Sequence, residues 1–377
     1  MTTRTPRVLV APDKFKGSLP ALAVAEAVAS GVRRVRPEVE VATLPVADGG
    51  DGTLDAALAS GFERVDVTVT GPTGEPVRTA YARRDGTAVV EMADACGLSR
   101  LPGGTPSALD ATSRGLGEAV AAALDAGCRS LVIGIGGSAS TDGGAGMVAA
   151  LGGRLLDADG KPLPDGGAGL DRLARLDLEG LHPALAETEV VVACDVDNPL
   201  TGPHGAAAVY GPQKGASLDD VARLDLALTG WADVVAATTG SDVRDRAGAG
   251  AAGGVGFAAL GLLGASLRPG IELMLDLLGF ESRVAGCHLV VTGEGSLDAQ
   301  SLHGKAPVGV AAAAGRHGVP VVAVCGRRTL DEATLAGAGI GAAYALLDVE
   351  PDPATCMRDA ARLLETVGEQ IAADHLV

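Results

Sequence analysis

Residues 131–151 read LVIGIGGSASTDGGAGMVAAL, which is an apolar run, a glycine-rich loop and a second apolar run. This order predicts a strand at 131–133, a loop from Gly134 to Gly146 and a helix at 147–151. Glycines let a backbone approach a ligand closely, and a helix start offers unpaired N–H groups and a positive dipole end to an anion. The stretch therefore indicates an α/β fold with a phosphate-binding loop. Taken alone, it also fits an ordinary strand-to-helix turn.

The composition limits the classes of partner. The chain has 377 residues, enough for two domains, and its 47% hydrophobic content supports full cores. A formal net charge of −17 repels phosphate backbones and anionic lipid, which argues against nucleic acid and membrane surfaces as partners. An anionic substrate must then be received locally, by lysines, helix N-termini or a divalent cation.

The cysteines and the N-terminus indicate a cytoplasmic protein. The six cysteines are scattered without a CxxC pair, as expected of thiols in a reducing compartment. The only early apolar run, 8–11, is too short for a secretory signal. No apolar run reaches the roughly 18 residues of a membrane span.

The two ends of the chain both predict alternating strands and helices. The first helix is expected to begin at Ser18, with the Ser18 side chain as its N-cap. Glycine at position 61 is expected to close a short helix. The predicted strands are 7–11, 39–46, 289–292 and 319–324, and the predicted helices start at 18, 54, 304 and 353.

The middle of the chain has a different pattern. From Arg64, valines alternate with polar residues, and Asp85-Gly86 is a hairpin signal, so an antiparallel meander is expected. Ser217 and Asp220 have capping-box spacing at the start of a helix. The apolar stripe expected on that helix is Leu218, Val221, Leu224, Leu228 and Trp231. We therefore predict an α/β domain formed by 1–62 and 285–377, with an inserted domain at 63–284.

Carboxylates recur in loops that follow apolar runs. In open α/β sheets, ligands bind beyond the carboxyl ends of the strands, so such loops can converge on one site. Any single aspartate is more simply read as a turn or helix cap. The loops are 12–18, 48–52, 138–144, 195–199 and 293–298.

These residue types suit phosphoryl transfer. Mg²⁺ is usually held by one or two carboxylates together with phosphate oxygens, and the hydroxyl nucleophile needs a base. Lys14 and Lys16 are candidate cations for a carboxylate or a phosphoryl group. Asp195 directly follows the apolar run 190–194 and is the candidate general base. Capping of its own turn is the competing role for Asp195.

Other familiar site motifs are missing from the sequence. It contains no Walker loop, nucleophile elbow, HExxH or protein-kinase signature. A dinucleotide-linked oxidoreductase built on Gly134-x-Gly136-x-x-Ala139 is a weak alternative, because no convincing acidic ribose partner follows roughly 20 residues later.

Six motifs in order resemble the bacterial glycerate kinase family over nearly the whole chain. They are APDKFKGS at 11–18, DGGDGT at 48–53, GGSASTDGG at 136–144, DVDNPLTG at 195–202, YGPQKG at 210–215 and TGEGSLDAQS at 292–301. The resemblance implies phosphorylation of D-glycerate by ATP with Mg²⁺, most often on the 2-hydroxyl. It also implies two α/β domains with a cleft between them, one a Rossmann-like or flavodoxin-like parallel-sheet domain formed by both termini and the other an inserted mixed domain.

For such a kinase we expect the following roles. Asp195 and Lys14 are the catalytic candidates. ATP phosphates are expected along Gly136, Gly137, Ser138, Ser140, Thr141 and Asp142. The substrate is expected at Lys16, Ser18, Asn198 and Asp298, and Mg²⁺ at Asp48, Asp51 and Glu294.

Two alternatives stay open at this point. One is a non-catalytic sensor that binds a hydroxy acid or nucleotide, and the other is a kinase that phosphorylates the 3-hydroxyl of glycerate. The expected partners are small molecules, and the expected assembly is a monomer or homodimer.

Overall fold

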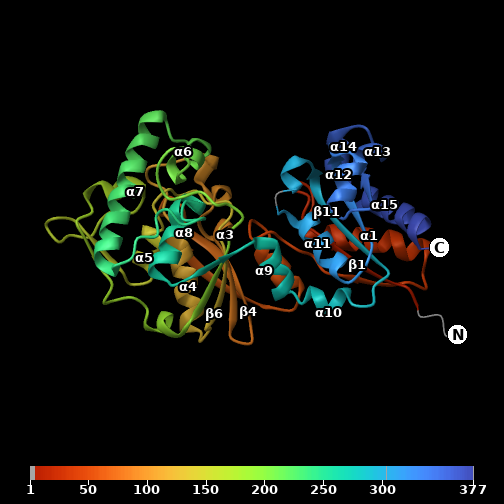
Figure 1. Cartoon of the computed structure of the whole chain (residues 1–377), viewed down its shortest axis with the longest axis horizontal. Coiled ribbons are helices and arrows are strands. Elements are labelled where there is room, and N and C mark those ends of the chain that lie inside the picture. Colours follow the sequence, from red (N-terminus) through yellow and green to blue (C-terminus); the bar gives the residue numbers. More distant parts are fainter. Residues whose placement is uncertain (1–4, 303, 377) are drawn as a thin grey trace. The chain divides into compact units, whose positions relative to one another are not determined.

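A computed structural model describes residues 5–302 and 304–376, which form two compact units (Figure 1). The first unit takes in Met1–Asp48, Asp55–Gly61 and Ile271–Val377, and the second takes in Gly49–Leu54 and Phe62–Gly270. Both ends of the chain therefore build one unit and the middle builds the other. The predicted two-domain α/β class is confirmed.

The first unit is built on a parallel sheet of five strands. Their order across the sheet is β13-β12-β11-β1-β2. Counted within this unit alone, that is the order 5-4-3-1-2, the flavodoxin-like arrangement. The strands are β1 (Arg7–Pro12), β2 (Glu40–Thr43), β11 (Leu289–Leu297), β12 (Val321–Arg328) and β13 (Ala342–Ala345).

Both faces of the central strands are buried, which is why β1 and the first part of β12 read as continuous apolar runs. Val8 and Val10 pack on one face with helices α1 (Ala21–Val35) and α15 (Ala360–His375). Figure 1 shows these two helices side by side, and Gly31 allows the contact, since a Cβ there would lie 2.0 Å from the carbonyl oxygen of Glu365.

The opposite face is covered by helices from the second half of the chain. Leu9 and Ala11 pack there with α9 (Gly270–Leu277), α10 (Phe280–Val284) and α11 (Ala306–Arg316). Ile271, Met274 and Phe280 belong to this core. Residues 271–284 therefore group with the first unit, whereas the sequence pattern placed them in the inserted domain.

The second unit has a mixed sheet in the order β10-β9-β6-β5-β4-β3. Strands β3 to β5 are the predicted antiparallel meander, and the hairpin at Asp85 and Gly86 has positive φ at both residues, 48° and 79°. Strand β10 was not predicted, because three residues carry little periodicity. The strands are β3 (Glu63–Thr70), β4 (Pro76–Arg84), β5 (Thr87–Glu91), β6 (Ser130–Gly134), β9 (Glu189–Ala193) and β10 (Ser266–Arg268).

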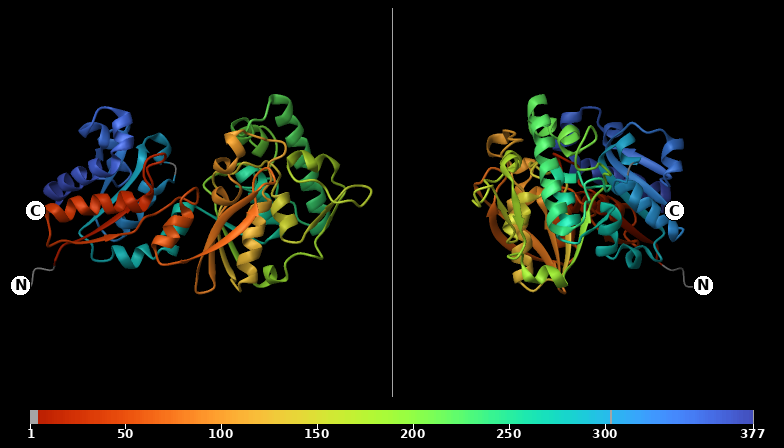
Figure 2. Two further views of the ribbon diagram at one scale, coloured as in Figure 1. Left: turned by 180° about the vertical axis from the view of Figure 1, so that it is seen from behind. Right: turned by 60° about the vertical axis from the view of Figure 1, so that its left-hand side comes forward.

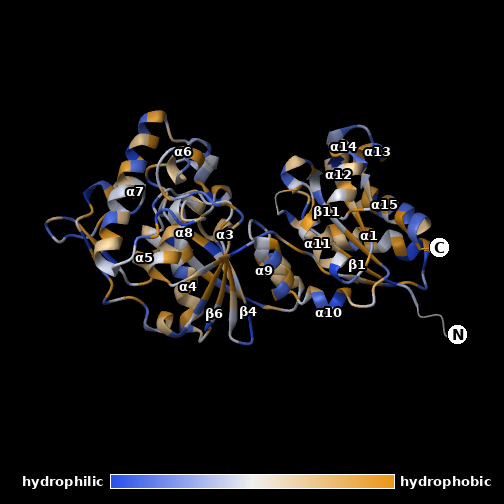
Figure 3. Ribbon diagram, in the orientation of Figure 1, coloured by the Kyte–Doolittle hydropathy of each residue, from blue (hydrophilic) through white to orange (hydrophobic). Residues whose placement is uncertain are grey.

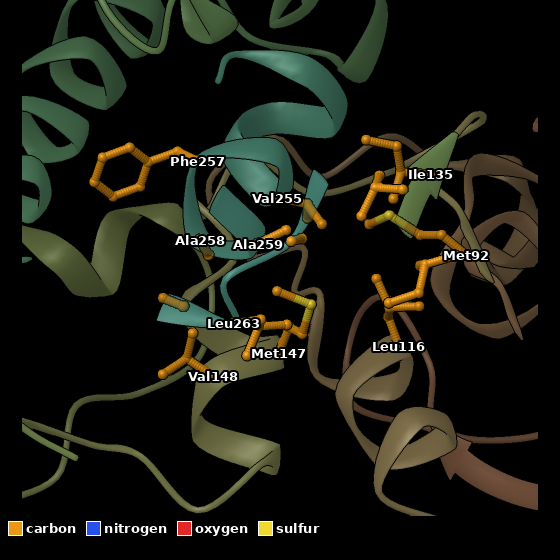
Figure 4. Close-up of a cluster of buried hydrophobic side chains, with 14 of the residues drawn as sticks. Met92, Leu116, Ile135, Met147, Val148, Val255, Phe257, Ala258, Ala259 and Leu263 are labelled. Atoms are coloured by element: carbon orange, nitrogen blue, oxygen red, sulfur yellow. The ribbon is translucent and has the colours of Figure 1, made fainter. Parts of the chain in front are cut away.

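Helices α4 (Arg114–Asp125), α5 (Ala145–Ala150), α7 (Leu218–Thr239) and α8 (Ala251–Leu262) enclose the core of this unit. Figure 4 shows part of this core, with Met92, Leu116 and Ile135 grouped beside Met147. Trp231 is fully buried and donates a 2.9 Å hydrogen bond to the carbonyl of Gly143.

The start of α7 shows both the strength and the limit of the sequence pattern. The Ser217–Asp220 capping box is present. Leu218, however, is 87% exposed and is not part of the buried stripe, because the first turn of α7 projects beyond the core. The alternating orange and blue along α7 in Figure 3 reflects its two faces.

The remaining elements complete the two units, which Figure 2 shows from other sides. No helix in the described ranges is both long enough and apolar enough to cross a membrane. All six cysteines are free thiols. The other helices and strands are α2 (Thr53–Ala59), α3 (Met92–Cys96), α6 (Ala206–Tyr210), α12 (Glu332–Gly337), α13 (Leu346–Val349), α14 (Pro353–Arg358), β7 (Arg154–Leu156) and β8 (Arg175–Asp177).

Candidate active site

The strand order of the first unit marks a place for a ligand. β1 lies between β2 and β11, and the chain leaves β1 toward one side of the sheet before it returns on the other. Such a switch in direction opens a crevice at the carboxyl ends of the two central strands. Pro12 pairs with Gly293, and the N–H of Asp13 donates a 2.8 Å bond to the carbonyl of Gly293. Asp13, directly after β1, and Glu294, within β11, therefore lie on neighbouring strands at this switch point.

The carboxylates at this point repel each other. Burial, and to a smaller extent the negative charges of Asp48 and Glu294, together raise the pKa of Asp13 to about 8. Burial also raises the pKa of Glu294. Perturbed carboxyls at a strand end are characteristic of functional sites. Asp13 was not among the predicted site residues, although its position directly after the first apolar run was a usable signal.

Glu294 has an orphaned oxygen. The residue is 8% exposed, and its Oε1 has no hydrogen-bond partner in the described part of the chain. Its Oε2 lies 3.7 Å from the Nζ of Lys305, which stands at the start of α11 and was also missed from the sequence. A buried carboxylate oxygen without a partner fits an acceptor site for a cation or a proton.

The donor set fits a Mg²⁺ site in which phosphate oxygens of the nucleotide supply the remaining ligands. Within the described ranges, no three histidine, cysteine or acidic side chains are grouped as a metal cage. Mg²⁺ in phosphoryl-transfer sites needs only one or two carboxylates, so Asp48 and Glu294 are sufficient in chemistry and number. Asp51 is exposed and belongs to the second unit, and its expected role at the metal stays a prediction.

The lysines of the first loop are accessible, but Ser18 does not cap a helix. Lys14 is half-buried, and its backbone N–H donates a 2.6 Å bond to Asp13 Oδ1, while Lys16 is exposed. Helix α1 begins at Ala21 with Pro20 as its N-cap residue, so the predicted start at Ser18 is wrong. Ser18 lies in a turn, where its backbone N–H donates to the carbonyl of Phe15. The Ser18 hydroxyl donates to the carbonyl of Met357 at 2.6 Å.

Asp298 has a structural role in its own turn. Its Oδ1 accepts a 2.9 Å bond from the N–H of Gln300, and its Oδ2 accepts one of 3.1 Å from the Ser296 hydroxyl. The Gln300 bond is the main reason that the pKa of Asp298 is lowered. This is the turn-capping role that any single loop aspartate can have.

The glycine loop of the second unit is largely buried. Gly137 is exposed and Gly136 is half-buried, whereas Ser138 is only 6% exposed. Ser140, Thr141 and Asp142 are completely buried. The accessible part of the predicted phosphate loop is therefore Gly136 and Gly137, with the nearly buried Ser138 next to them.

Asp142 occupies the helix start that was expected to hold a ligand anion. Its carboxylate accepts bonds from the N–H groups of Gly144 and Gly146, each at 3.1 Å, and from the N–H and hydroxyl of Ser113, each at 2.8 Å. The Ser113 hydroxyl in turn accepts from the N–H of Met147 at 2.9 Å. The expectation of unpaired N–H groups at the start of α5 is wrong, because Asp142 and Ser113 already satisfy them.

A buried lysine lies behind this loop. Lys214 is 1% exposed and donates from Nζ to the Ser138 hydroxyl at 2.8 Å and to the Ser140 carbonyl at 2.5 Å. Burial lowers the pKa of Lys214 to about 7. The YGPQKG motif contains Lys214, yet no pattern in the sequence shows that this lysine folds back onto a loop 76 residues earlier.

Asp195 and Asn198 follow β9 at the same edge of the second sheet. Asp195 is exposed, and its Oδ1 accepts a 2.8 Å bond from the N–H of Gly270 at the start of α9. Both ends of the Asn198 amide bond to the protein, with Nδ2 donating to His204 and Oδ1 accepting from the Tyr210 hydroxyl at 2.6 Å. Asp195 thus presents a carboxylate at a strand end, while Asn198 braces its loop.

Comparison with known proteins agrees with this picture. The model of the glycerate kinase family matches residues 8–376. A glycerate kinase of Bacillus subtilis is 46% identical over 370 residues, which is 97% of each chain. A glycerate 2-kinase of Escherichia coli K12 is 45% identical over 345 residues, or 90% of each chain.

A solved structure extends the similarity to the fold. The crystal structure of a protein described as glycerate kinase 2 from Salmonella typhimurium LT2 superposes with a TM-score of 0.87 at 43% identity, covering 98% of each chain. A match that covers 98% of the chain takes in both units. The chain therefore belongs to the glycerate kinase family and is a kinase.

Proposed function

We propose that this kinase transfers the γ-phosphoryl group of ATP to the 2-hydroxyl of D-glycerate, giving 2-phosphoglycerate and ADP. The observation that carries the proposal is the 45% identity, over 90% of each chain, with the protein named glycerate 2-kinase in Escherichia coli. The perturbed carboxyls and lysines at the strand ends support it, since phosphoryl transfer requires cations, a metal site and a base.

In the first unit, we assign Asp48 and Glu294 to Mg²⁺. The orphaned Glu294 Oε1 supports this assignment. Bound there with nucleotide, the metal would neutralise charge on the phosphate oxygens. Lys14 and Lys16 supply the positive charge that the carboxylate of glycerate needs in a chain with a net charge of −17.

In the second unit, we assign the ATP phosphates to Gly136, Gly137 and Ser138. The exposure of Gly136 and Gly137 supports the assignment, and Ser138 directly follows them. The complete burial of Ser140, Thr141 and Asp142 gives those three a part in holding the loop instead of touching the nucleotide. Asp195 is the proposed acceptor of the hydroxyl proton, because it is the exposed carboxylate at the end of β9 and is oriented by the Gly270 N–H.

The test is the identity of the product. Purified protein is incubated with ATP, Mg²⁺ and D-glycerate, and ADP release is followed by a coupled assay, with L-glycerate and no acceptor as controls. Carbon and phosphorus NMR of the product then separates 2-phosphoglycerate from 3-phosphoglycerate. Formation of the 3-phosphate would replace the proposed regiochemistry, and ATP binding without ADP release would favour the sensor.

The same family membership supports a cytoplasmic enzyme, as do the six free thiols. Fractionation of the native cells tests this assignment. Recovery of the protein with the periplasmic fraction would contradict it.

A further inference from the structure

The ammonium group of Lys214 is buried and hydrogen-bonds to uncharged groups. Lys214 is 1% exposed, and the partners of its Nζ within the described residues are a hydroxyl and a backbone carbonyl, neither of them charged. Burying an ammonium group costs several kcal/mol unless its hydrogen bonds are made, and an apolar side chain of similar length would fill the same space more cheaply. A lysine held in this way points to a function for its charge.

The two bonds of Lys214 fix one end of the glycine loop. Nζ donates to Ser138 Oγ at 2.8 Å and to the carbonyl of Ser140 at 2.5 Å. The loop is tied on its other side as well, since the carbonyl of Gly137 accepts a 2.9 Å bond from the N–H of Leu98. Ser138 is therefore held from both sides, directly beside the exposed Gly137.

The bond from Lys214 decides what the Ser138 hydroxyl can do. A serine hydroxyl has one hydrogen to donate and two lone pairs to accept with. Lys214 has no lone pair when it is charged, so Ser138 must accept from it, and the hydroxyl hydrogen is left for another group. Within the residues that the structure describes, Ser138 Oγ donates no hydrogen bond and accepts the one from Lys214.

We infer that Lys214 is a positioning residue of the nucleotide site, which holds Ser138 so that the Ser138 hydroxyl donates its single hydrogen to a phosphate oxygen of ATP. The inference rests on the proposed function in assigning ATP to this loop. The charge of Lys214 polarises the Ser138 O–H bond and makes it a stronger donor than a free serine. The buried ammonium thus acts on the phosphate through Ser138.

The lowered pKa of Lys214, about 7, supports the arrangement. Asp142 and Cys96 face this group electrostatically, and both raise its pKa against the larger effect of burial. The charged form of Lys214 is the one present below its pKa, so binding of ATP is expected to weaken as the pH rises through about 7. In this arrangement the titration of Lys214 affects ATP binding only through the Ser138 hydroxyl, so removal of that hydroxyl should abolish this part of the pH dependence.

The experiment compares K214M, S138A and the double variant with the wild type. Binding of Mg-ATP is measured by calorimetry, and kcat and KM are measured for ATP and for D-glycerate. Each single variant is expected to lower ATP affinity and kcat/KM for ATP by about tenfold or more, the usual effect of losing a hydrogen bond to a charged group. KM for glycerate is expected to stay within about twofold. The double variant is expected to bind ATP as tightly as the single variant with the lower ATP affinity, because the two residues act through one contact. The control is K161M, because Lys161 is a surface lysine with 75% of its side chain exposed.

The pH dependence of ATP binding provides the second readout. The wild-type decline of ATP affinity as the pH rises through about 7 is expected to be absent in S138A. This measurement tests the inference even if K214M fails to fold. The inference would be overturned if the losses of ATP affinity in K214M and S138A multiplied in the double variant. Wild-type ATP binding by S138A would overturn it as well. If the wild type binds ATP through Lys214 and Ser138 but does not phosphorylate glycerate, the proposed function fails and the inference stands. If the variants bind ATP normally while the wild type phosphorylates glycerate, the proposed function stands and the inference fails.

Discussion

The carboxylate of Glu91 accepts a 2.8 Å hydrogen bond from the backbone N–H of Leu54, which lies 37 residues earlier in the chain. Both of its oxygens also accept from the N–H of Gly52 at 3.2 Å. Glu91 is buried at the end of β5, so it anchors the segment that carries the DGGDGT motif to the second unit. Substitution of Glu91 is expected to loosen this motif.

Glu91 should make stability depend on pH. Burial raises the pKa of Glu91 from 4.5 to about 7. Between these values the folded protein keeps a proton that the unfolded chain loses, so the free energy of unfolding falls as the pH rises from about 4.5 to 7 and the effect levels off above. The variant E91Q cannot titrate and is expected to show a smaller decline. Urea unfolding at pH 5, 6, 7 and 8 measures it.

The control for E91Q is E187Q, because Glu187 is exposed. It is expected to keep the wild-type pH profile. A decline in E91Q as steep as that of the wild type would show that other groups cause it.

Ser113 and Asp142 should stabilise the second unit. The variant S113A removes a donor to Asp142 and the acceptor for the Met147 N–H, and it is expected to lower the free energy of unfolding by about 1–3 kcal/mol. The matched variant S107A, in which a surface hydroxyl bonded to Asp110 is lost, is expected to change it by less than about 0.5 kcal/mol. Urea unfolding at pH 7 compares the two. Equal effects would mean that the Asp142 network is not a main support of the loop.

The fold could be predicted from the sequence further than the site could. Strand β1 and the hairpin at Asp85 follow from local patterns, because alternation and turn residues act over a few positions. The start of α1 could not be placed correctly, since the helix begins at Ala21 after Pro20 as its N-cap residue. Ser18 instead bonds to Met357, 339 residues away.

The site residues that the sequence did not identify depend on long-range packing. Lys214 reaches Ser138 only after the second unit has folded, and burial, not sequence, sets its pKa. Asp142 looks like a ligand contact in the sequence, yet four hydrogen bonds from the protein satisfy its carboxylate. A local motif gives the residue type, while burial and partners decide whether the side chain faces a ligand.

Glu294 should determine the dependence on Mg²⁺. Because Glu294 Oε1 is buried without a partner among the described residues, E294Q keeps the shape but weakens a cation site. We expect the Mg²⁺ concentration for half-maximal activity to rise by about tenfold or more, and chelation by EDTA to abolish wild-type activity. The control E281Q alters a surface glutamate that pairs with Arg316. An E294Q variant with wild-type Mg²⁺ dependence would place the metal elsewhere.

Asp195 should act on the chemical step. If it accepts the hydroxyl proton, D195N is expected to lower kcat by about a hundredfold or more, with little change in KM for ATP. The amide keeps an oxygen for the Gly270 N–H, so the fold should be retained. The exposed Asp219, at the first turn of α7, provides the control D219N. Wild-type turnover in folded D195N would remove Asp195 as the base.

Two glycines with similar backbone angles should differ sharply in what they tolerate. Gly253 and Gly240 have φ of 70° and 76°. Alanine at either position would therefore adopt a left-handed backbone conformation that costs about 1–2 kcal/mol. At Gly240 an added Cβ meets nothing within 4 Å, whereas at Gly253 it would lie 2.0 Å from the carbonyl of Ser140. That carbonyl is the one that accepts from Lys214. G253A is therefore expected to be the more destabilised variant in thermal unfolding, and also to raise KM for ATP, while G240A keeps wild-type kinetics. Equal loss of stability in the two variants, with ATP kinetics unchanged in G253A, would show that the loop behind Ser138 does not need this close approach.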